Sequence, residues 1–228
     1  MISVILYEPQ KAGNVGSVCR AMKNFGAKNL VMVNPCKLDD NAAMMAVHAK
    51  EVLEKAKTFE SFEEAKKNFD LTIATTARVT GKDDYFLKIP FTPEELRKKL
   101  EKVEGKIAIV FGPEDSGLPN EIVEQCDMCV TIPTHNAYRS MNLSHAVAVV
   151  LYELSKLPSG EKPRLASGKE LSLIKENFSE IVKGADYPAD KRKVFNSMIR
   201  KLIGRAQVTG REANTLIGVL KKIRSKIL

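Results

Sequence analysis

The sequence lacks the features of membrane-spanning and exported proteins. It contains no apolar run of the roughly 18 residues that a membrane helix needs, and no basic-then-apolar leader at its start. Four cysteines in 228 residues do not resemble a disulfide framework. Hydrophobic residues make up 44% and charged residues 28% of the chain, which allows a core to be buried. We therefore expect a soluble cytoplasmic protein with one domain of ordinary size, with or without an extension.

Several common ligand-binding patterns are also missing. The first apolar segment is not followed by a G-x-G-x-x-G fingerprint or by a lysine placed for a phosphate loop, so ordinary dinucleotide and nucleotide triphosphate sites are poorly supported. Cys126 and Cys129 have the spacing of half a zinc site, but no second pair of cysteines or histidines accompanies them. The histidines are dispersed, and His48 is expected on a helix over residues 46–56. We expect no metal.

The excess of positive charge lies in the last part of the chain. Residues 1–164 carry 22 Lys and Arg against 22 Asp and Glu, whereas residues 165–228 carry 14 against 6. This last part therefore supplies the whole net charge of +8. A solvated helix surface would also explain a run of charges, but a neutral body with a basic tail favours nucleic acid as a partner.

Short apolar runs alternate with helical patterns over the first two thirds of the chain. The runs are typical of buried parallel strands and cover residues 4–6, 30–33, 71–74, 107–111 and 129–132. The helical patterns cover residues 14–25, 92–100, 120–126 and 142–157, with capping signals at Asn14, at Thr92, and at Ser140 or Asn142. Strands that alternate with helices predict an α/β fold with a mostly parallel sheet.

A linker that contains proline and glycine precedes a helical extension. The expected boundaries are residues 1–157 for the first domain, 158–167 for the linker and 168–228 for the extension. Apolar residues at helical spacing predict three short helices in the extension, the last of them capped by Thr209 with Glu212. Because they have little core of their own, we expect these helices to pack on the first domain or on a second subunit, and to bind RNA.

Two loops are expected at the carboxyl edge of the sheet. Residues 112–118, Gly-Pro-Glu-Asp-Ser-Gly-Leu, follow one strand, and residues 140–144, Ser-Met-Asn-Leu-Ser, lead into the last helix of the first domain. Alone, the first loop could be a simple turn, since Pro, Asp and Gly are turn residues. Open α/β sheets nevertheless hold their ligands at this edge. The helix after the first strand also offers N–H groups suited to a phosphate or another anion.

Three blocks, in order along the chain, carry a family resemblance. They are Asn14-x-Gly16-Ser17-x-x-Arg20, Phe111-Gly112-Pro113-Glu114-x-x-Gly117-Leu118, and Ile132-Pro133 followed by Ser140-Met141-Asn142-Leu143-Ser144. They resemble the signature motifs of the SPOUT superfamily of RNA 2′-O-methyltransferases, in its SpoU/TrmH-type branch. Over residues 1–157 the chain is most similar to the tRNA (cytidine/uridine-32) 2′-O-methyltransferases, and the extension resembles theirs only in its size and its basic helical character.

The resemblance implies a fold, a cofactor and an assembly. Members of this family have an α/β sheet whose C-terminal part is threaded into a deep trefoil knot, bind S-adenosylmethionine in the knot loops, and act on tRNA as homodimers. At the matching positions, the cofactor pocket would be lined by Thr75, Thr76, Ala77, Gly112, Glu114, Ile132, Arg139, Ser140, Met141 and Leu143. Arg139 stands where a small residue is common.

The resemblance also implies catalytic residues, and together with the positive charge of the extension it predicts RNA-binding residues. The catalytic residues would be Arg20, Asn14, Ser140 and Asn142. A general-base role for Arg20 is physically unfavourable, because the pKa of a guanidinium lies above about 12. We expect Arg20 to hold a phosphate and the developing alkoxide, while the proton leaves through a phosphate oxygen or water. RNA contacts are expected from Arg20, Arg78, Lys82, Lys191, Arg192, Arg200 and Lys201.

Three alternatives remain at this point. The same chemistry could act on ribosomal RNA or on another tRNA nucleotide, and the target base could be cytidine alone or also uridine. A knotted RNA-binding protein without catalysis is opposed by the intact Arg20, Asn142 and both cofactor loops. A nicotinamide-dependent oxidoreductase would need a glycine fingerprint and an acidic ribose ligand, and the sequence has neither.

Overall fold

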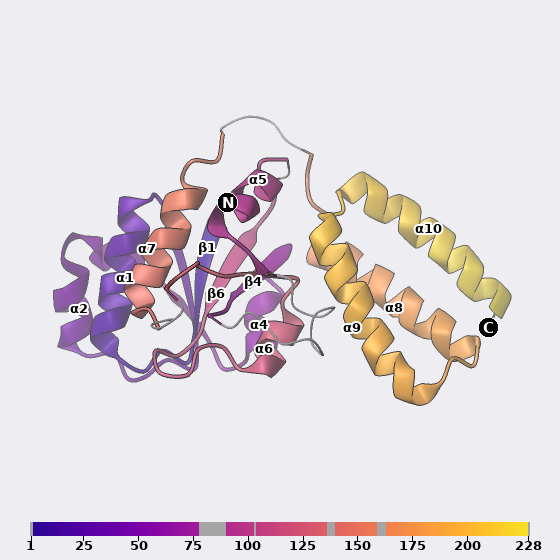
Figure 1. The fold of residues 1–228 in the computed structure, drawn as a ribbon, viewed down its shortest axis with the longest axis horizontal. Coiled ribbons are helices and arrows are strands. Elements are labelled where there is room, and N and C mark those ends of the chain that lie inside the picture. The colour runs from indigo at the N-terminus through magenta and orange to yellow at the C-terminus, as the bar shows by residue number, and fades with distance from the viewer. Residues whose placement is uncertain (1, 78–89, 103, 136–139, 159–162, 228) are drawn as a thin grey trace.

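The computed structural model describes residues 2–77, 90–102, 104–135, 140–158 and 163–227. Seven strands form one sheet in the order β3-β2-β1-β6-β4-β7-β5, and every pair of neighbours is parallel (Figure 1). The strands are β1 Ile2–Tyr7, β2 Asn29–Val33, β3 Lys57–Phe59, β4 Leu71–Thr75, β5 Pro90–Phe91, β6 Ile107–Phe111 and β7 Met128–Val130. This arrangement confirms the predicted α/β class. The sequence did not indicate β3 and β5, which have only three and two residues.

Helices cover both faces of the sheet (Figure 1). They are α1 Ala12–Asn24, α2 Asp40–Ala46, α3 Lys50–Glu54, α4 Phe62–Lys66, α5 Pro93–Leu100, α6 Asn120–Gln125 and α7 Leu143–Leu154. Because side chains alternate along a strand, Val4 and Leu6 of β1 join the hydrophobic cluster formed with α1 and α7. Ile5, between them, joins the cluster formed with α4 and α6 on the other face.

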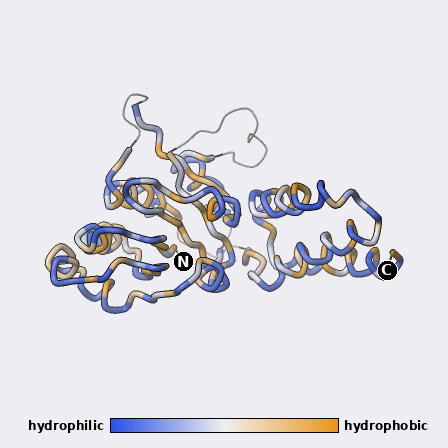
Figure 2. The backbone as a smooth tube through the Cα atoms, turned by 90° about the horizontal axis from the view of Figure 1, so that it is seen from below, coloured by the Kyte–Doolittle hydropathy of each residue, from blue (hydrophilic) through white to orange (hydrophobic). Residues whose placement is uncertain are grey.

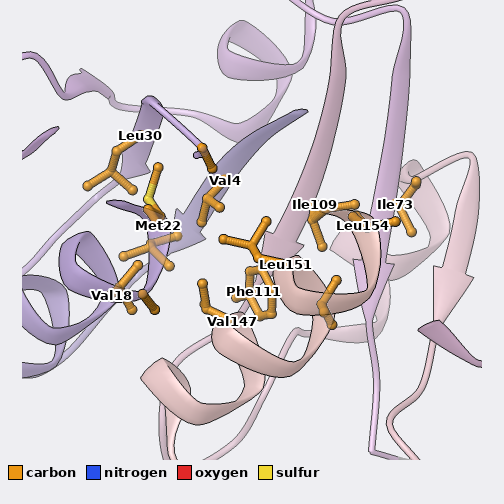
Figure 3. Packing of buried hydrophobic residues seen from close by; sticks show 14 of the residues in the cluster. Val4, Val18, Met22, Leu30, Ile73, Ile109, Phe111, Val147, Leu151 and Leu154 are labelled. Atoms are coloured by element: carbon orange, nitrogen blue, oxygen red, sulfur yellow. The ribbon is translucent and has the colours of Figure 1, made fainter. Parts of the chain in front are cut away.

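The larger cluster holds α1 and α7 side by side. Figure 3 shows Val18 and Met22 of α1 close to Val147 and Leu151 of α7, next to the strand residue Val4. All five side chains are at most 2% exposed. Full burial of one such side chain stabilises the fold by about 1.5–3 kcal/mol. This packing keeps the beginnings of the two helices at the carboxyl edge of the sheet.

Three of the predicted helix caps are confirmed. Thr92 forms a capping box with Glu95 at the start of α5. Asn142, the second of the two candidates, caps α7 through its side chain. Thr209 Oγ1 accepts a hydrogen bond from the Glu212 N–H at 3.4 Å, and the Glu212 carboxylate accepts one in return from the Thr209 N–H at 2.8 Å. These polar side chains satisfy N–H groups that have no partner inside the helix.

Two local predictions are wrong. Asn14 does not cap α1, because the helix already begins at Ala12 with Lys11 as its N-cap residue, which leaves Asn14 inside the first turn. The helix expected over residues 46–56 is not continuous. A 3-10 turn, Val47–Ala49, separates α2 from α3 and contains the exposed His48.

The extension consists of three long helices. They are α8 Gly168–Gly184, α9 Ala189–Ala206 and α10 Gly210–Ile227, with 17, 18 and 18 residues. The expectation of short helices with little core of their own is wrong, since Ile174, Ile203 and Ile217 meet in a separate hydrophobic cluster. The helices lie to one side of the sheet (Figure 1), and hydrophobic and hydrophilic residues alternate along them (Figure 2). No described helix has the length and apolar character needed to cross a membrane.

Residues 163–167 are packed against both parts of the chain. Leu165 is buried in the main cluster, whereas the next residue, Ala166, is buried in the cluster of the extension. The Leu165 N–H donates to the Glu104 carbonyl at 2.7 Å, and the Ala166 N–H donates to the Val208 carbonyl at 2.8 Å. Residues 163–167, at the end of the expected linker, are therefore held in place by both parts of the chain. The division into domains stays a proposal.

The trefoil knot also stays a prediction. The family resemblance places it in the C-terminal part of the first domain, and residues 136–139 of that part lie outside the described ranges. The strand order shows instead why the signature blocks can meet, because β1, β6, β4 and β7 are neighbours in the sheet.

Candidate active site

Neighbouring parallel strands end at one edge of the sheet and bring the predicted loops together. Leu6 of β1 lies opposite Phe111 of β6, and Thr75 of β4 lies opposite Val130 of β7. The segments that leave this edge are residues 8–11, 76–77, 112–119 and 131–135. An open α/β sheet holds its ligands at this edge.

Glu114 connects the loop after β6 to the start of α1. Its Oε2 accepts a hydrogen bond from the Gln10 N–H at 2.9 Å, and its Oε1 accepts from the Lys11 N–H at 3.2 Å and from Asn14 Nδ2 at 2.8 Å. Burial alone would raise the pKa of Glu114, but these donors favour the carboxylate and hold the pKa below its ordinary value of 4.5. The carboxylate of Glu114 thus lies next to the start of α1, where the sequence suggested an anion, and binds the N–H groups of the two residues that precede the helix.

Asn14 also connects α1 to α7. Asn142 Nδ2 donates to Asn14 Oδ1 at 3.4 Å, while Asn142 Oδ1 accepts from the Ser144 N–H at 2.9 Å. Asn14, Glu114 and Asn142 come from the three separate signature blocks, and they form one hydrogen-bonded chain. We call this chain the Asn14–Glu114–Asn142 network.

Replacement of Glu114 by glutamine is expected to lower the free energy of unfolding at pH 7 by about 1–3 kcal/mol, since hydrogen bonds to a charged acceptor are lost. The folded-state pKa of Glu114 lies below 4.5, so its stabilising contribution is present above pH 4.5 and is lost as the pH falls through the folded pKa. Urea denaturation from pH 7 downwards measures both effects. Glu114→Gln should lose stability less steeply in acid than the parent protein, whereas the exposed control Asp115→Asn should follow the parent. Parallel curves for the parent and Glu114→Gln would contradict this.

The same loop folds back tightly on itself. A Cβ atom at Gly112 would lie 2.3 Å from the Leu118 nitrogen and 2.4 Å from the Gly117 carbonyl carbon, both of them backbone atoms. Gly117 has a φ of +70°, a conformation that favours glycine. The two glycines therefore shape the loop that presents Glu114. The sequence suggested that Gly112 lets the backbone approach a ligand, but the close approach in the structure is to the loop itself.

Gly112→Ala is expected to displace residues 112–118 and to lower the stability by about 1–3 kcal/mol, because backbone atoms cannot move aside cheaply. The control is Gly218→Ala, where an added Cβ atom meets nothing within 4 Å. Thermal unfolding of both variants measures the effect. A variant as stable as the parent would show that the loop adapts.

Comparison with known families agrees with this geometry. The model of the SpoU rRNA methylase family matches residues 1–152. The chain belongs to this family. It is therefore an RNA methyltransferase, and the three blocks that the network joins are motifs of a SpoU enzyme.

Relatives of this SpoU enzyme match the extension as well. The tRNA (cytidine-2′-O-)-methyltransferase TrmJ of Methanocaldococcus jannaschii is 42% identical over 97% of this chain and 99% of its own length. The tRNA (cytidine/uridine-2′-O-)-methyltransferase TrmJ of Pectobacterium atrosepticum is 32% identical over 98% and 96%. The crystal structure of TrmJ from Z. mobilis ZM4 superimposes with a TM-score of 0.78 at 30% identity, covering 98% of this chain and 99% of that one. These matches confirm the resemblance to the TrmJ-type branch.

The cofactor residues predicted for this SpoU enzyme differ in exposure. Thr75, Thr76, Ile132 and Met141 are half-buried, and Ala77 and Ser140 are exposed. Leu143 is only 5% exposed and belongs to the main hydrophobic cluster, so its side chain supports the core. Arg139 lies outside the described residues. The structure brings Glu114 together with Asn14 and Asn142, and it ties Thr75 to β6 through a 2.9 Å hydrogen bond from Oγ1 to the Val110 carbonyl.

Arg20 lies on α1, after Asn14, and is exposed. Within the described residues it has no hydrogen-bond or ion-pair partner. Its neighbour Cys19 is buried, and burial raises the pKa of this thiol to about 12, so it remains protonated. Of these two adjacent side chains, only Arg20 can meet a substrate from solution.

The predicted RNA-binding residues divide into different groups. Arg78 and Lys82 lie outside the described residues, and Lys191 is exposed. Arg192 is half-buried, and its Nε donates to the Tyr187 carbonyl at 2.7 Å. The prediction for Lys201 needs correction, because its side chain is buried inside the protein and satisfied there. Arg200 is half-buried and donates to a backbone carbonyl of α6.

Sequence reasoning missed two kinds of residue. Gln10 and Lys11 hold Glu114 through backbone N–H groups, which carry no signal in the sequence. Asp127 is only 3% exposed at the start of β7. Its signal was present, since an acidic residue next to an apolar strand needs partners if it is buried.

Proposed function

We propose that this protein transfers the methyl group of S-adenosylmethionine to the ribose 2′-hydroxyl of cytidine 32 in the anticodon loop of tRNA. The observation that carries the proposal is the Asn14–Glu114–Asn142 network, which joins the three signature blocks at the carboxyl edge of the sheet. Membership of the SpoU family supplies the reaction class. The relatives named as tRNA 2′-O-methyltransferases support the substrate class.

The described residues at this edge fit the proposed cofactor. Ile132 and Met141 are half-buried apolar side chains that can contact an adenine ring, and the backbone of the surrounding loops can satisfy its polar edge. When bound, S-adenosylmethionine supplies a methyl group already activated by the positive charge of the sulfonium. The protein then has two tasks, to align the ribose hydroxyl and to manage one proton.

Arg20 is the residue suited to hold the RNA. A guanidinium presents several donors in one plane, so it can bind a phosphate and also stabilise negative charge that develops on the 2′-oxygen. Because a guanidinium is a poor proton acceptor, we assign the hydroxyl proton to a phosphate oxygen or to water. Asn14 and Asn142 keep the starts of α1 and α7 together, which gives them a positioning role. The exposed Ser140 precedes α7 at the same edge.

The relatives favour cytidine as the main target. The relative from M. jannaschii, at 42% identity, is named for cytidine alone, whereas the relative named for cytidine and uridine is 32% identical. We therefore propose cytidine as the main base, while position 32 is proposed from the family resemblance of the signature blocks. The family's link with ribosomal RNA makes rRNA the alternative substrate.

Mass mapping of ribose methylation in tRNA and rRNA, from cells with and without this protein, tests the substrate. The expected result is the loss of one 2′-O-methyl group at position 32 of tRNA. Purified protein should then methylate a tRNA transcript with C32, but not the same transcript with 2′-deoxycytidine at that position. Methylation that disappears only from rRNA, or an unchanged map, would overturn the proposal.

The proposal includes a homodimer. Val149 and Tyr152 of α7 are 39% and 54% exposed, so this helix presents apolar surface that the sheet does not cover. Covering such a surface with a second copy would bury it from water. One chain has a mass of 25.3 kDa. Sedimentation equilibrium at micromolar concentration is expected to give a species of twice that mass. A single species at the chain mass would contradict it.

A further inference from the structure

The last turn of α6 is surrounded by cationic side chains from the extension. Lys201 Nζ, on α9, donates to the carbonyl oxygens of Val123 and Cys126, each at 2.8 Å. Arg200, the preceding residue, donates from Nη1 to the Glu124 carbonyl at 2.6 Å. Carbonyl groups at the end of a helix lack partners within the helix and carry the negative end of its dipole. The extension therefore supplies positively charged hydrogen-bond donors to the carbonyl groups at the end of α6.

Asp127, directly before β7, is the second element of this contact. Its Oδ2 accepts from the Thr72 N–H at 2.9 Å and from Thr72 Oγ1 at 2.7 Å, and its Oδ1 lies 3.6 Å from Lys175 Nζ on α8. Burial by itself would raise the pKa of Asp127. The ammonium groups of Lys66 and Lys175 and the Thr72 hydrogen bonds nevertheless hold that pKa below its ordinary value. The buried carboxylate thus stays ionised and attracts α8.

Gly204 allows a close contact between α9 and Asp127 because it has no side chain. An added Cβ atom would lie 2.6 Å from the Asp127 Cβ and 2.7 Å from its carbonyl oxygen. α9 can therefore approach β7 this closely only with glycine at position 204. Ile199 and Ile203 of the same helix face the core of the extension, so α9 is buried on two sides. Asp127, Lys175, Arg200, Lys201 and Gly204 together are called the docking cluster.

The docking cluster lies away from the catalytic edge. Asp127 precedes the first residue of β7, whereas Ile132 follows the last one, so the extension is attached at the amino end of a strand whose carboxyl end leads to the candidate site. Thr72, which binds Asp127, likewise lies near the amino end of β4, whereas Thr75 is the last residue of that strand. The extension can thus be held firmly without entering the cofactor pocket.

We propose that Gly204 and Lys201 are positioning residues, which fix the basic extension to β7 and α6 so that its exposed cations meet the tRNA in register with Arg20. This inference rests on the proposed function for its substrate. It assigns Lys201 a role in tRNA binding that acts through the position of the extension and involves no contact with RNA, since the Lys201 side chain is buried at 4% exposure.

The variant Gly204→Ala tests this without changing any charge. Gly218→Ala is the matched control, because it makes the same change inside a helix of the extension and an added Cβ atom meets nothing within 4 Å. For Gly204→Ala we expect the KM for tRNA to rise at least about fivefold, with kcat and cofactor affinity within about twofold of the parent. Gly218→Ala should leave all three within about twofold.

Hydrogen exchange without RNA tests the docking independently of the substrate. Peptides that cover residues 123–130 and 197–206 are expected to exchange at least about tenfold faster in Gly204→Ala than in the parent, and unchanged in Gly218→Ala. If the parent protein does not methylate tRNA, the proposed function fails, and the exchange data still decide whether the extension docks here. Unchanged exchange would overturn the docking. Faster exchange with an unchanged KM would overturn the positioning role.

A second pair of variants removes the same charge at two places. Lys201→Met takes the ammonium from the docking cluster, and Lys50→Met removes an exposed one from α3 of the first domain. We expect Lys201→Met to reproduce the KM and exchange effects of Gly204→Ala, and Lys50→Met to show neither. An equal rise in KM for both, with exchange unchanged in both, would mean that Lys201 acts only by its charge and would overturn the inference. If Lys201→Met does not fold, Gly204→Ala alone decides.

Discussion

Arg20→Ala is expected to lower kcat for methyl transfer by about a hundredfold to a thousandfold, the usual effect of removing one donor that stabilises charge in a transition state. Cofactor affinity should stay within about twofold, because Arg20 points to solvent on α1 and is not among the residues of the proposed pocket. Single-turnover rates with tRNA, together with calorimetric titration of S-adenosylmethionine, measure the two quantities separately.

Arg20→Lys separates charge from shape. A lysine keeps the positive charge but offers a compact ammonium in place of a planar set of donors, so we expect it to fail nearly as badly as alanine. The control is Lys28→Ala, which removes an exposed cation between α1 and β2. Near-normal turnover by Arg20→Lys would show that a point charge is enough. A loss of cofactor binding in Arg20→Ala would place Arg20 in the pocket.

The order of the elements could be predicted because each local signal agrees with its burial. The strand runs at residues 4–6 and 107–111 are continuous and apolar, as strands covered on both faces must be. Thr92 and Asn142 cap helices because their side chains accept hydrogen bonds from backbone N–H groups close by in sequence. Short edge strands such as β5 give too few residues for a periodic signal.

The sequence singled out Asn14, Glu114 and Asn142, but it did not predict the hydrogen bonds that join them. Asn14 was identified as a helix cap because asparagine favours that position, and in the structure it instead binds Glu114, one hundred residues later. The positive end of α1 suggested a bound anion, and the carboxylate that meets it comes from a distant loop. Periodicity reports local burial. It carries no information about which distant side chains meet.

Lys201 shows that the sequence also does not reveal whether a charged side chain is exposed or buried. In the sequence it is one of 14 basic residues in the last 64, and nothing distinguishes it from an exposed lysine. In the structure, the face of α9 that carries Lys201 and Gly204 packs on α6 and β7. A glycine inside a helical pattern was the available signal, because it often marks a close packing contact. The number of basic residues in the sequence is therefore larger than the number of basic side chains that are exposed and can contact RNA.

The exposed cations that remain should still carry much of the tRNA affinity. Lys191 and Lys193 on α9 and Lys221 and Lys222 on α10 are all exposed. Each phosphate that a protein neutralises adds about 0.7–0.9 to the slope of log affinity against log salt, since condensed counterions are released. If each of the four meets one phosphate, their replacement by glutamine should lower the slope by about 3, which corresponds to a loss of affinity of about a hundredfold or more at 0.15 M salt.

Binding of tRNA at several salt concentrations measures this slope. The control carries the same four-charge loss on the first domain, at Lys28, Lys50, Lys67 and Lys102, which are also exposed. Its slope should change by less than about 1, because a general loss of net charge weakens binding less than the loss of direct contacts. Both proteins keep the docking cluster, so the position of the extension is unchanged in the comparison. A slope of the extension variant unchanged from that of the parent protein would show that these four lysines do not contact the backbone of tRNA, and would move recognition to Arg78, Lys82 and Arg139 in the first domain.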